Sequence, residues 1–165
     1  MRTDLGMAAP EFIVRRATEA DGTGILNCLA AAFEPYRANY TPAAFLDTVL
    51  SPNTISQRLQ AMQVFVAVTG EQRVVGSIAC AVAQSGEGHL RGMAVLPQLQ
   101  GHKLAESLLN TAEEELRRLG CSRIILGTTE PLVRAMRFYE KHGYVRSGKI
   151  VDFLGMPLHE FVKQV

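Results

Sequence analysis

The sequence predicts an α/β protein of the α+β type, built on a mixed central sheet of about six or seven strands with helices on its faces. Three observations predict this class. Residues 64–95 contain three stretches with the alternation of strands, as in an antiparallel meander. Residues 101–119 carry leucines at helical spacing and lead into a short apolar strand at 124–126, which is typical of burial on both faces. Antiparallel and parallel parts of the sheet are therefore expected to meet between residues 89 and 126.

The first strand and the first helix follow one another closely. Phe12–Arg16 has the composition of a strand. The helix begins near Thr18 and Asp21, whose side chains can cap it, and Pro35 ends or bends it.

A second helix is expected after Thr41-Pro42, because Thr can cap a helix and Pro suits its first turn. Its apolar residues recur on one face. Ser51-Pro52-Asn53 breaks this helix, and residues 56–62 add a further turn.

Turn residues separate the remaining elements. The strands of the meander are predicted at 64–68, 73–83 and 89–95. The long helix opens at Gly101 and stops at Gly120, and a third helix over 132–142 stops at Gly143. The last two strands are expected at 144–145 and 158–162, joined by a stretch that contains Gly148, Gly155 and Pro157.

Length, charge and cysteine content limit the function. The 165 residues suffice for one domain, which we assign to residues 12–165 after a flexible leader over residues 1–11. Seventeen basic and sixteen acidic residues give a net charge of +1, which argues against nucleic acid or an anionic membrane as partner. The longest apolar run, residues 78–83, is far shorter than a membrane span, and no signal peptide is recognisable, so a cytoplasmic protein is expected. Buried thiols are expected at the scattered Cys28, Cys80 and Cys121, and no metal site is expected.

Residues 95–105 carry the strongest indication of function, because a strand leads through a short turn with Gly101 straight into a long amphipathic helix. Amide groups in a first helical turn lack intrahelical acceptors, and the aligned peptide dipoles place roughly half a positive charge there. The sequence therefore predicts an anion site on the amides of residues 101–105. The alternative is that Gly101 only makes a turn and water caps the helix. Neither the nucleoside-triphosphate loop nor the dinucleotide glycine pattern is present.

Two motifs about thirty residues apart extend this interpretation. The first joins Met93-Ala94-Val95-Leu96-Pro97 to Gln100-Gly101-His102-Lys103-Leu104-Ala105, and the second runs from Ala135 through Phe138-Tyr139-Glu140-Lys141-His142-Gly143-Tyr144. With the order of elements, they resemble the GNAT superfamily of acetyl-CoA-dependent N-acetyltransferases over residues 12–163. The resemblance implies that family's splayed sheet and acetyl-CoA as acyl donor.

In that family the turn binds the diphosphate of coenzyme A, and the strand before it pairs with the pantetheine arm and polarises the acetyl carbonyl. The resemblance implies a cofactor site at Met93, Ala94, Val95, Gln100, Gly101, His102, Lys103, Leu104 and Ala105. Two positions depart from the pattern. Lys103 stands at the family's central glycine, so either the geometry tolerates its side chain or its ammonium reaches a phosphate. Leu132 stands at an asparagine that contacts pantetheine in the family.

Tyr139 lies where the family often has the tyrosine that protonates the departing thiolate. The role suits a phenol, which is neutral at pH 7 and can donate a proton. The alternative is that Tyr139 only packs between Phe138 and Tyr144.

The acceptor amine arrives mostly protonated at pH 7, so a base is also needed. His89 is the first candidate, because some family members keep a base six residues before the position of Val95. Glu87, Glu130 and water are rivals. Counting by twos places His89 on one strand face with Arg91, Met93 and Val95.

The family's acceptor channel is walled by the first two helices and by the loop before the last strand. The residues that these segments offer are Phe33, Glu34 and Tyr36, with Arg37, Tyr40, Asp152 and Phe153 nearby. Aromatic rings there could enclose a substrate, and an acidic group could attract an ammonium. An ordinary loop between helices is the alternative.

The leading hypothesis is an enzyme that passes the acetyl group directly to a primary amine of a small molecule. One alternative is a non-catalytic acyl-CoA sensor, which the departures at Lys103 and Leu132 invite. Another is acetylation of a macromolecule such as a protein N-terminus or an aminoacyl-tRNA, which gains nothing from the near-neutral charge. Dimers are frequent among similar proteins, so the resemblance also implies a homodimer as one assembly.

Overall fold

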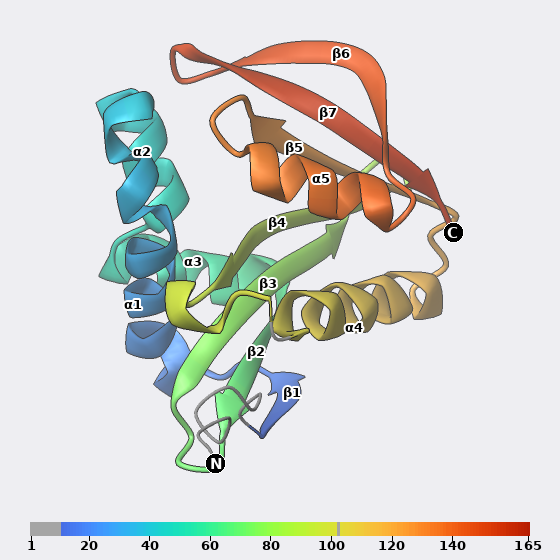
Figure 1. Cartoon of the computed structure of the whole chain (residues 1–165). Helices are drawn as coiled ribbons and strands as arrows, with labels where there is room; N and C mark the ends of the chain where they lie inside the picture. Colours follow the sequence, from blue (N-terminus) through green and yellow to red (C-terminus); the bar gives the residue numbers. More distant parts are fainter. Residues whose placement is uncertain (1–10, 102) are drawn as a thin grey trace, which may run out of the picture.

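The computed structural model describes residues 11–101 and 103–165. The expected leader, apart from Glu11, and His102 lie outside these residues. One seven-stranded sheet has the order β1-β2-β3-β4-β5-β7-β6 (Figure 1). Its strands are β1 (Phe12–Arg16), β2 (Gln63–Thr69), β3 (Val74–Val82), β4 (Gly88–Val95), β5 (Arg123–Thr129), β6 (Val145–Phe153) and β7 (Met156–Gln164).

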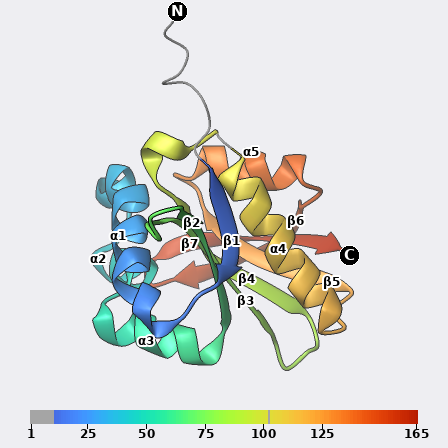
Figure 2. The same cartoon turned by 90° about the horizontal axis from the view of Figure 1, so that it is seen from below.

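Helices cover both faces of this sheet. The long ones are α1 (Gly22–Phe33), α2 (Pro42–Val49), α3 (Pro52–Ala61), α4 (Leu104–Arg118) and α5 (Val133–Lys141), and the short 3-10 turns are η2 (Glu19–Asp21), η3 (Glu34–Asn39) and η4 (Pro97–Leu99). α1 to α3 lie on one side of the sheet and α4 on the other, as the view from below makes clear (Figure 2). The core between these layers is apolar and includes Ile25, Ile78, Leu108, Leu116 and Phe161.

The predicted fold class is confirmed, including the antiparallel meander of β2, β3 and β4 and the parallel pairing of β4 with β5. Thr41 caps α2 as expected, since its Oγ1 accepts a hydrogen bond from the Ala44 amide at 3.1 Å. The three cysteines are buried, also as expected.

The prediction for residues 51–62 was wrong in extent. Ser51-Pro52 does not only end α2; it starts the ten-residue helix α3. Thr54 Oγ1 accepts from the Ser51 amide at 2.7 Å, and the Thr54 amide donates to Ser51 Oγ at 3.4 Å. This reciprocal capping, with Pro52 in the first turn, makes the break a helix start.

The last two strands are longer than predicted. β6 and β7 form a hairpin from Val145 to Gln164, and only Leu154 and Gly155 lie in its turn. Gly148 sits at a register irregularity of β6 with φ of +91°. Pro157 pairs with Asp152 beyond the last residue that β7 shares with β5, so its missing amide hydrogen costs no bond to β5.

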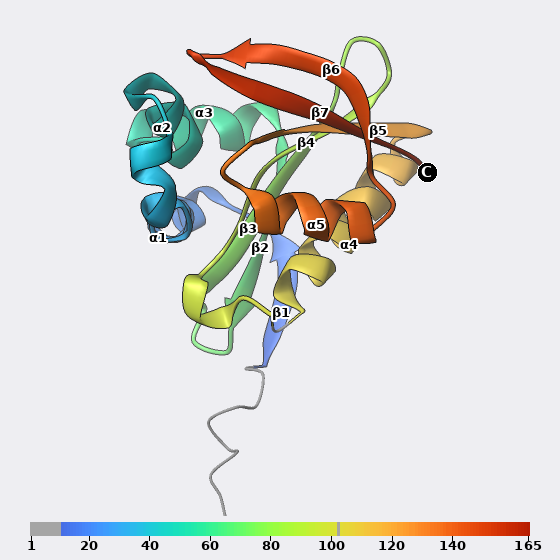
Figure 3. The same cartoon turned by 45° about the horizontal axis from the view of Figure 1, so that its top comes forward.

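β4 and β5 separate soon after they meet, so the expected splay is present. Their parallel pairing covers only Gly88–Leu90 opposite Ile124–Leu126. Beyond it the two strands diverge, and β5, β7 and β6 run at a steep angle to β2–β4 (Figure 3). From Arg91 onward, no strand of the described part of the chain pairs with this edge of β4.

A bulge changes the direction of side chains along β4. Arg91 lies opposite Ala79 and Ala94 opposite Ser77, so Gly92 and Met93 together oppose one residue of β3. Gly92 has φ of +68°, and its carbonyl accepts from Ser77 Oγ at 3.2 Å. The expectation that Val95 shares a face with His89 was therefore wrong: the register places Ala94 on that face.

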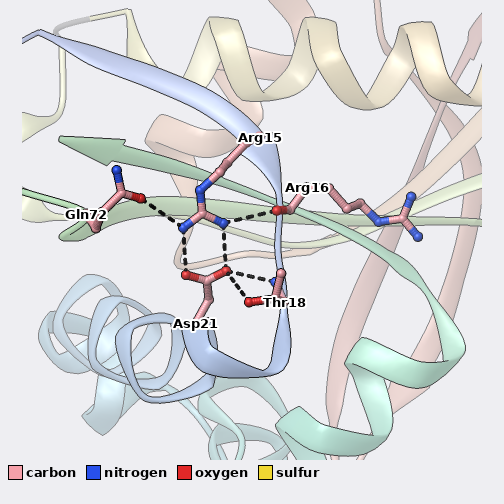
Figure 4. A network of polar contacts seen from close by, with 5 residues as sticks. All are labelled: Arg15, Arg16, Thr18, Asp21 and Gln72. Atoms are coloured by element: carbon pink, nitrogen blue, oxygen red, sulfur yellow. Dashed lines mark hydrogen bonds and ion pairs between the residues drawn. The ribbon is translucent and has the colours of Figure 1, made fainter. Parts of the chain in front are cut away.

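A polar network joins β1 to the start of α1 (Figure 4). Arg15 contacts both carboxylate oxygens of Asp21, at 2.8 and 2.9 Å. Asp21 also accepts from the Thr18 amide at 2.8 Å, and Arg15 reaches Gln72 at 3.4 Å. The bidentate pair fixes the direction in which the chain enters α1.

Candidate active site

A cavity of about 750 Å³ lies where β4 and β5 diverge. At one end, here named the α1–α3 end, it is lined by Phe33, Tyr36, Tyr40, Asp47, Thr48 and Arg58. At the other, the α4–α5 end, the lining includes Gln100, Gly101, Lys103, Ala105, Leu132, Arg134 and Tyr139. Residues 89–95 of β4 and 126–129 of β5 form the middle. The cavity therefore runs through the sheet from one helical layer to the other.

The amino terminus of α4 presents amide groups to the α4–α5 end. Among the described residues, the amides of Leu104, Ala105 and Glu106 have no hydrogen-bond acceptor, and Lys103 provides no side-chain cap. Ala105 lines the cavity. Free amides and the helix dipole together favour a bound anion at this point.

Cationic side chains flank this helix start. Arg134 Nη1 donates to Gln100 Oε1 at 3.1 Å, and the other terminal nitrogen of Arg134 would lie 3.9 Å from a Cβ at Gly101. Gln100 in turn donates through Nε2 to the Val95 carbonyl at 3.3 Å. Arg134 and Lys103 both line the cavity, so two positive charges stand beside the start of α4.

The main chain of β4 offers hydrogen-bonding groups to the middle of the cavity. The Ala94 carbonyl points toward β3, since it would lie 3.2 Å from a Cβ at Gly76. The Leu96 amide also bonds to β3, at the Val75 carbonyl. Val95 lies between Ala94 and Leu96 and alternates with them, so its amide faces the gap between β4 and β5. The Met93 amide faces the same way, because it belongs to the trans peptide whose carbonyl, that of Gly92, bonds to Ser77 of β3.

Tyr139 and Tyr144 differ in what their hydroxyl groups contact. The Tyr144 hydroxyl donates to the buried Glu113 at 2.7 Å, and Lys163 Nζ donates to the same carboxylate at 3.0 Å. Tyr139 is only 8% exposed, lines the cavity and has no hydrogen-bond partner for its hydroxyl among the described residues. Burial raises the pKa of Tyr139, so its hydroxyl keeps its proton at neutral pH.

His89 lines the cavity from β4. Burial, and then the charges of Arg91 and Arg58, lower the pKa of His89 below its ordinary value. At neutral pH its imidazole is therefore uncharged and able to accept a proton.

Solved structures share this architecture. An acetyltransferase of the GNAT family from Staphylococcus aureus Mu50 superposes with a TM-score of 0.76 at 15% identity, over 93% of this chain and 99% of that chain. The PaiA N-acetyltransferase from Thermoplasma acidophilum, solved in complex with coenzyme A, gives 0.74 at 16% identity, over 94% and 99%. At these identities the likeness establishes the fold.

The family model for acetyltransferases (GNAT) matches residues 26–144. The chain belongs to the GNAT family. A curated relative, the aminoalkylphosphonate N-acetyltransferase of Salmonella typhimurium strain LT2, is 38% identical over 60 residues. That match spans 36% of this chain and 39% of the relative.

Lys103, the departure from the GNAT turn, adopts a left-handed conformation with φ of +66°. Glycine reaches this region without strain, which explains the glycine of the family pattern, whereas a lysine there costs roughly 1 kcal/mol. The backbone at Lys103 thus has a conformation that glycine also adopts. Leu132, the second departure, precedes α5 and lines the cavity without capping the helix. His102 lies outside the described residues.

The expected acceptor residues do not all reach the cavity. Phe33 and Tyr36 line it, together with Tyr40, whose hydroxyl lies 2.7 Å from that of Thr129. Glu34 is exposed and bonds to Arg37 instead, at 3.0 Å. It is not among the cavity-lining side chains.

The two acidic rivals of His89 are engaged elsewhere. Glu87 pairs with Arg123 at 2.9 Å, and Glu130 lies 3.3 Å from His159. Neither lines the cavity, whereas His89 does. Within residues 11–101 and 103–165, no cluster of three His, Cys, Asp or Glu side chains is arranged to hold a metal ion.

Sequence reasoning missed several residues of the lining, among them Arg58, Arg134 and Thr128. Arg58 and Arg134 belong to helices whose place beside β4 no local pattern reveals. Thr128 is 3% exposed, and its hydroxyl has no partner among the described residues. A threonine at the end of a strand that faces a splay could have been singled out only once the splay itself was known.

Proposed function

We propose that this protein transfers the acetyl group of acetyl-CoA directly to a primary amine of a small molecule. One observation carries the proposal: a single cavity joins the amino terminus of α4, the open edge of β4 and the Tyr139 hydroxyl. Acetyl-CoA needs an anion site for its diphosphate, hydrogen-bonding groups for its pantetheine arm and a proton donor for its sulfur, and these features can provide all three.

The residues present fit acetyl-CoA. Its diphosphate would bind the amides of residues 104–106, with Arg134 and Lys103 beside them. The pantetheine arm would pair with the open edge of β4 in the manner of an added strand. Acetyl-CoA supplies the activated acetyl group.

The side chains then have separate tasks. The amides of Met93 and Val95 would donate to the acetyl carbonyl oxygen and so stabilise the negative charge that develops there. The amine nitrogen forms a bond to the carbonyl carbon, and the carbon–sulfur bond breaks. His89, or a water, takes a proton from the amine, and Tyr139 gives a proton to the leaving sulfur.

Two features support a small acceptor. The cavity is a cleft with aromatic side chains at its α1–α3 end, as small-molecule sites often are. The name of the Salmonella relative also gives a small molecule with an amine as its acceptor.

Thiol release from acetyl-CoA, measured against a panel of amines, tests this function. Release that depends on the amine, with a product heavier by one acetyl group, is the expected result. Tight binding of acetyl-CoA without release for any amine would contradict it and favour a sensor instead.

Domain extent, location and assembly stay predictions. We assign the activity to a single domain of residues 12–165.

No helix within the described part of the chain is long and apolar enough to cross a membrane. The three free, buried cysteines are typical of a reducing compartment, in line with a cytoplasmic location. Size-exclusion chromatography with light scattering tests the homodimer.

A further inference from the structure

Arg58 has an unusual environment at the α1–α3 end of the cavity. Its side chain is half-buried and reaches from α3 to the bulge of β4, where Nη1 would lie 2.7 Å from a Cβ at Gly92. Among the described residues, no ion pair or hydrogen bond engages its guanidinium. Its donors are therefore directed at the cavity or at water.

The charges around Arg58 do not balance. Arg91 Nη2 lies 3.0 Å from Asp47 Oδ2, so the only carboxylate in the described lining of this end is already paired. Burial, followed by the charge of Arg91, lowers the pKa of Arg58 to about 10, and Asp47 only partly opposes this. Two guanidinium groups thus share one carboxylate, and one added anion would neutralise the excess.

A purely structural arginine would look different. Arg15 uses its guanidinium in a bidentate pair with Asp21 and so holds two segments together. Arg58 makes no ion pair or side-chain hydrogen bond among the described residues, yet its guanidinium is partly shielded from water. A charged group that has lost water contacts without gaining a protein partner is expected where a ligand provides the missing partner.

We propose that the acceptor amine also carries an oxyanion, a carboxylate or a phosphate group, and that Arg58 binds it. The proposal rests on the acetyl-transfer function stated above. A guanidinium offers parallel donors that match two oxygens of either group. Arg58 contacts β4 at Gly92, directly before Met93, whose amide would hold the acetyl group, so a short acceptor would bridge Arg58 and the acetyl carbon. The substrate class is a short amino carboxylate or amino phosphate.

Matched amines test this class. The first pair is 3-aminopropanoate and its neutral amide, 3-aminopropanamide; the second is O-phosphoethanolamine and ethanolamine. We compare kcat/KM within each pair for the native protein, for Arg58→Gln and for Arg58→Lys. Arg118→Gln is the matched control, because Arg118 lies on α4, pairs with Glu115 and is no part of the cavity lining. Circular dichroism and the Tm verify that each variant folds.

The native protein should prefer the anionic member of at least one pair, and that pair distinguishes a carboxylate from a phosphate. Arg58→Gln should reduce this preference by about 10- to 100-fold, and Arg58→Lys should restore part of it, whereas Arg118→Gln should not change it. Equal use of anionic and neutral amines, or a preference that survives in Arg58→Gln, would overturn the proposal while leaving acetyl transfer intact.

Calorimetry of the same amines with the acetyl-CoA-loaded protein separates the two proposals. Arg58-dependent binding of an anionic amine, with no thiol release for that amine or for any other of the panel, would support the anion site and refute acetyl transfer. Absence of Arg58-dependent binding would refute the anion site whatever the turnover.

Discussion

Tyr139 and Tyr144 belong to the same aromatic cluster, with ring centroids 5.8 Å apart, but within residues 11–101 and 103–165 only the Tyr144 hydroxyl has a hydrogen-bond partner. Tyr139→Phe should lower kcat by about 100-fold or more with little change in the KM for acetyl-CoA, because it removes only the proton for the leaving sulfur. Tyr144→Phe is the control: it removes the bond to Glu113 and should lower the free energy of unfolding by about 1–3 kcal/mol without a comparable loss of kcat. Steady-state kinetics and urea unfolding measure both. Native kcat in Tyr139→Phe would remove Tyr139 from the mechanism.

The protonation of His89 should determine how kcat depends on pH on the acid side. Its neutral form is the base, so kcat should rise as pH rises through its lowered pKa, and the midpoint should lie below the ordinary value of about 6.5. Arg91→Gln removes one of the charges that lower this pKa, and it should therefore move the midpoint upward. His89→Gln should abolish the limb and reduce kcat. A limb that persists unchanged in His89→Gln would assign the base to another group or to water.

Substitution of Asp21 should change the stability of the protein and not its activity. Asp21→Asn should reduce the free energy of unfolding by about 2 kcal/mol at pH 7, since a buried carboxylate bonded to Arg15 and Thr18 is lost. Hydrogen bonding to Arg15 is the main cause that lowers the pKa of Asp21 in the folded protein. The stabilisation is therefore present above the unfolded pKa and is lost as pH falls through the lower, folded pKa.

Urea unfolding at pH 7 and at pH 3 checks this effect, and the difference between native protein and variant should shrink at the lower pH. Glu34→Gln, in an exposed pair with Arg37, should change stability little. A native-like unfolding curve for Asp21→Asn at pH 7 would refute the assignment.

Among the single elements, the bulge of β4 adjoins both proposed sites: Gly92 contacts Arg58 of the anion site and precedes Met93 of the acetyl-CoA site. Gly92→Ala introduces a Cβ at positive φ and 2.7 Å from Arg58 Nη1. It should destabilise the protein by about 1–2 kcal/mol and displace the guanidinium. Gly70→Ala is the control, because no atom lies within 4 Å of the added Cβ. Urea unfolding compares them, and equal curves would show that the bulge tolerates a side chain.

The elements show how far sequence alone could go. Helix spacing and the caps at Thr41 and Gly120 predicted α2 and α4, because these signals are local. α3 was curtailed because Ser51-Pro52 can end one helix and start another, and only the paired hydrogen bonds with Thr54 decide between the two. The bulge at Gly92 changes register through pairing with β3, which no pattern within β4 encodes.

The candidate site was predictable to the same degree. The turn before α4 and Tyr139 stand in contiguous motifs that resemblance could match. Arg58 lies more than thirty positions before Gly92 in the sequence, and the two meet only because α3 packs on the face of the sheet that carries the bulge. Glu34 was expected in the site, but the neighbouring Arg37 directs it to the surface.

At the scale of the whole molecule, function depends on a sheet that does not close. Three paired positions hold β4 to β5, and everything beyond them opens into the cavity. Lys103 before α4 and Arg134 of α5 supply cations at the α4–α5 end, whereas α1–α3 and η3 supply aromatic side chains and Arg58 at the other end. The proposed diphosphate site at the start of α4 and the proposed amine site at the α1–α3 end therefore lie on opposite sides of one opening in the sheet.

Amide chemical shifts during titration with acetyl-CoA show whether the opening between β4 and β5 binds the acyl donor. In ¹H–¹⁵N spectra of the full chain, the largest changes should fall on the amides of Met93, Val95, Leu104, Ala105 and Glu106. Spectra that stay unchanged at millimolar acetyl-CoA, or changes confined to residues away from the opening between β4 and β5, would contradict it.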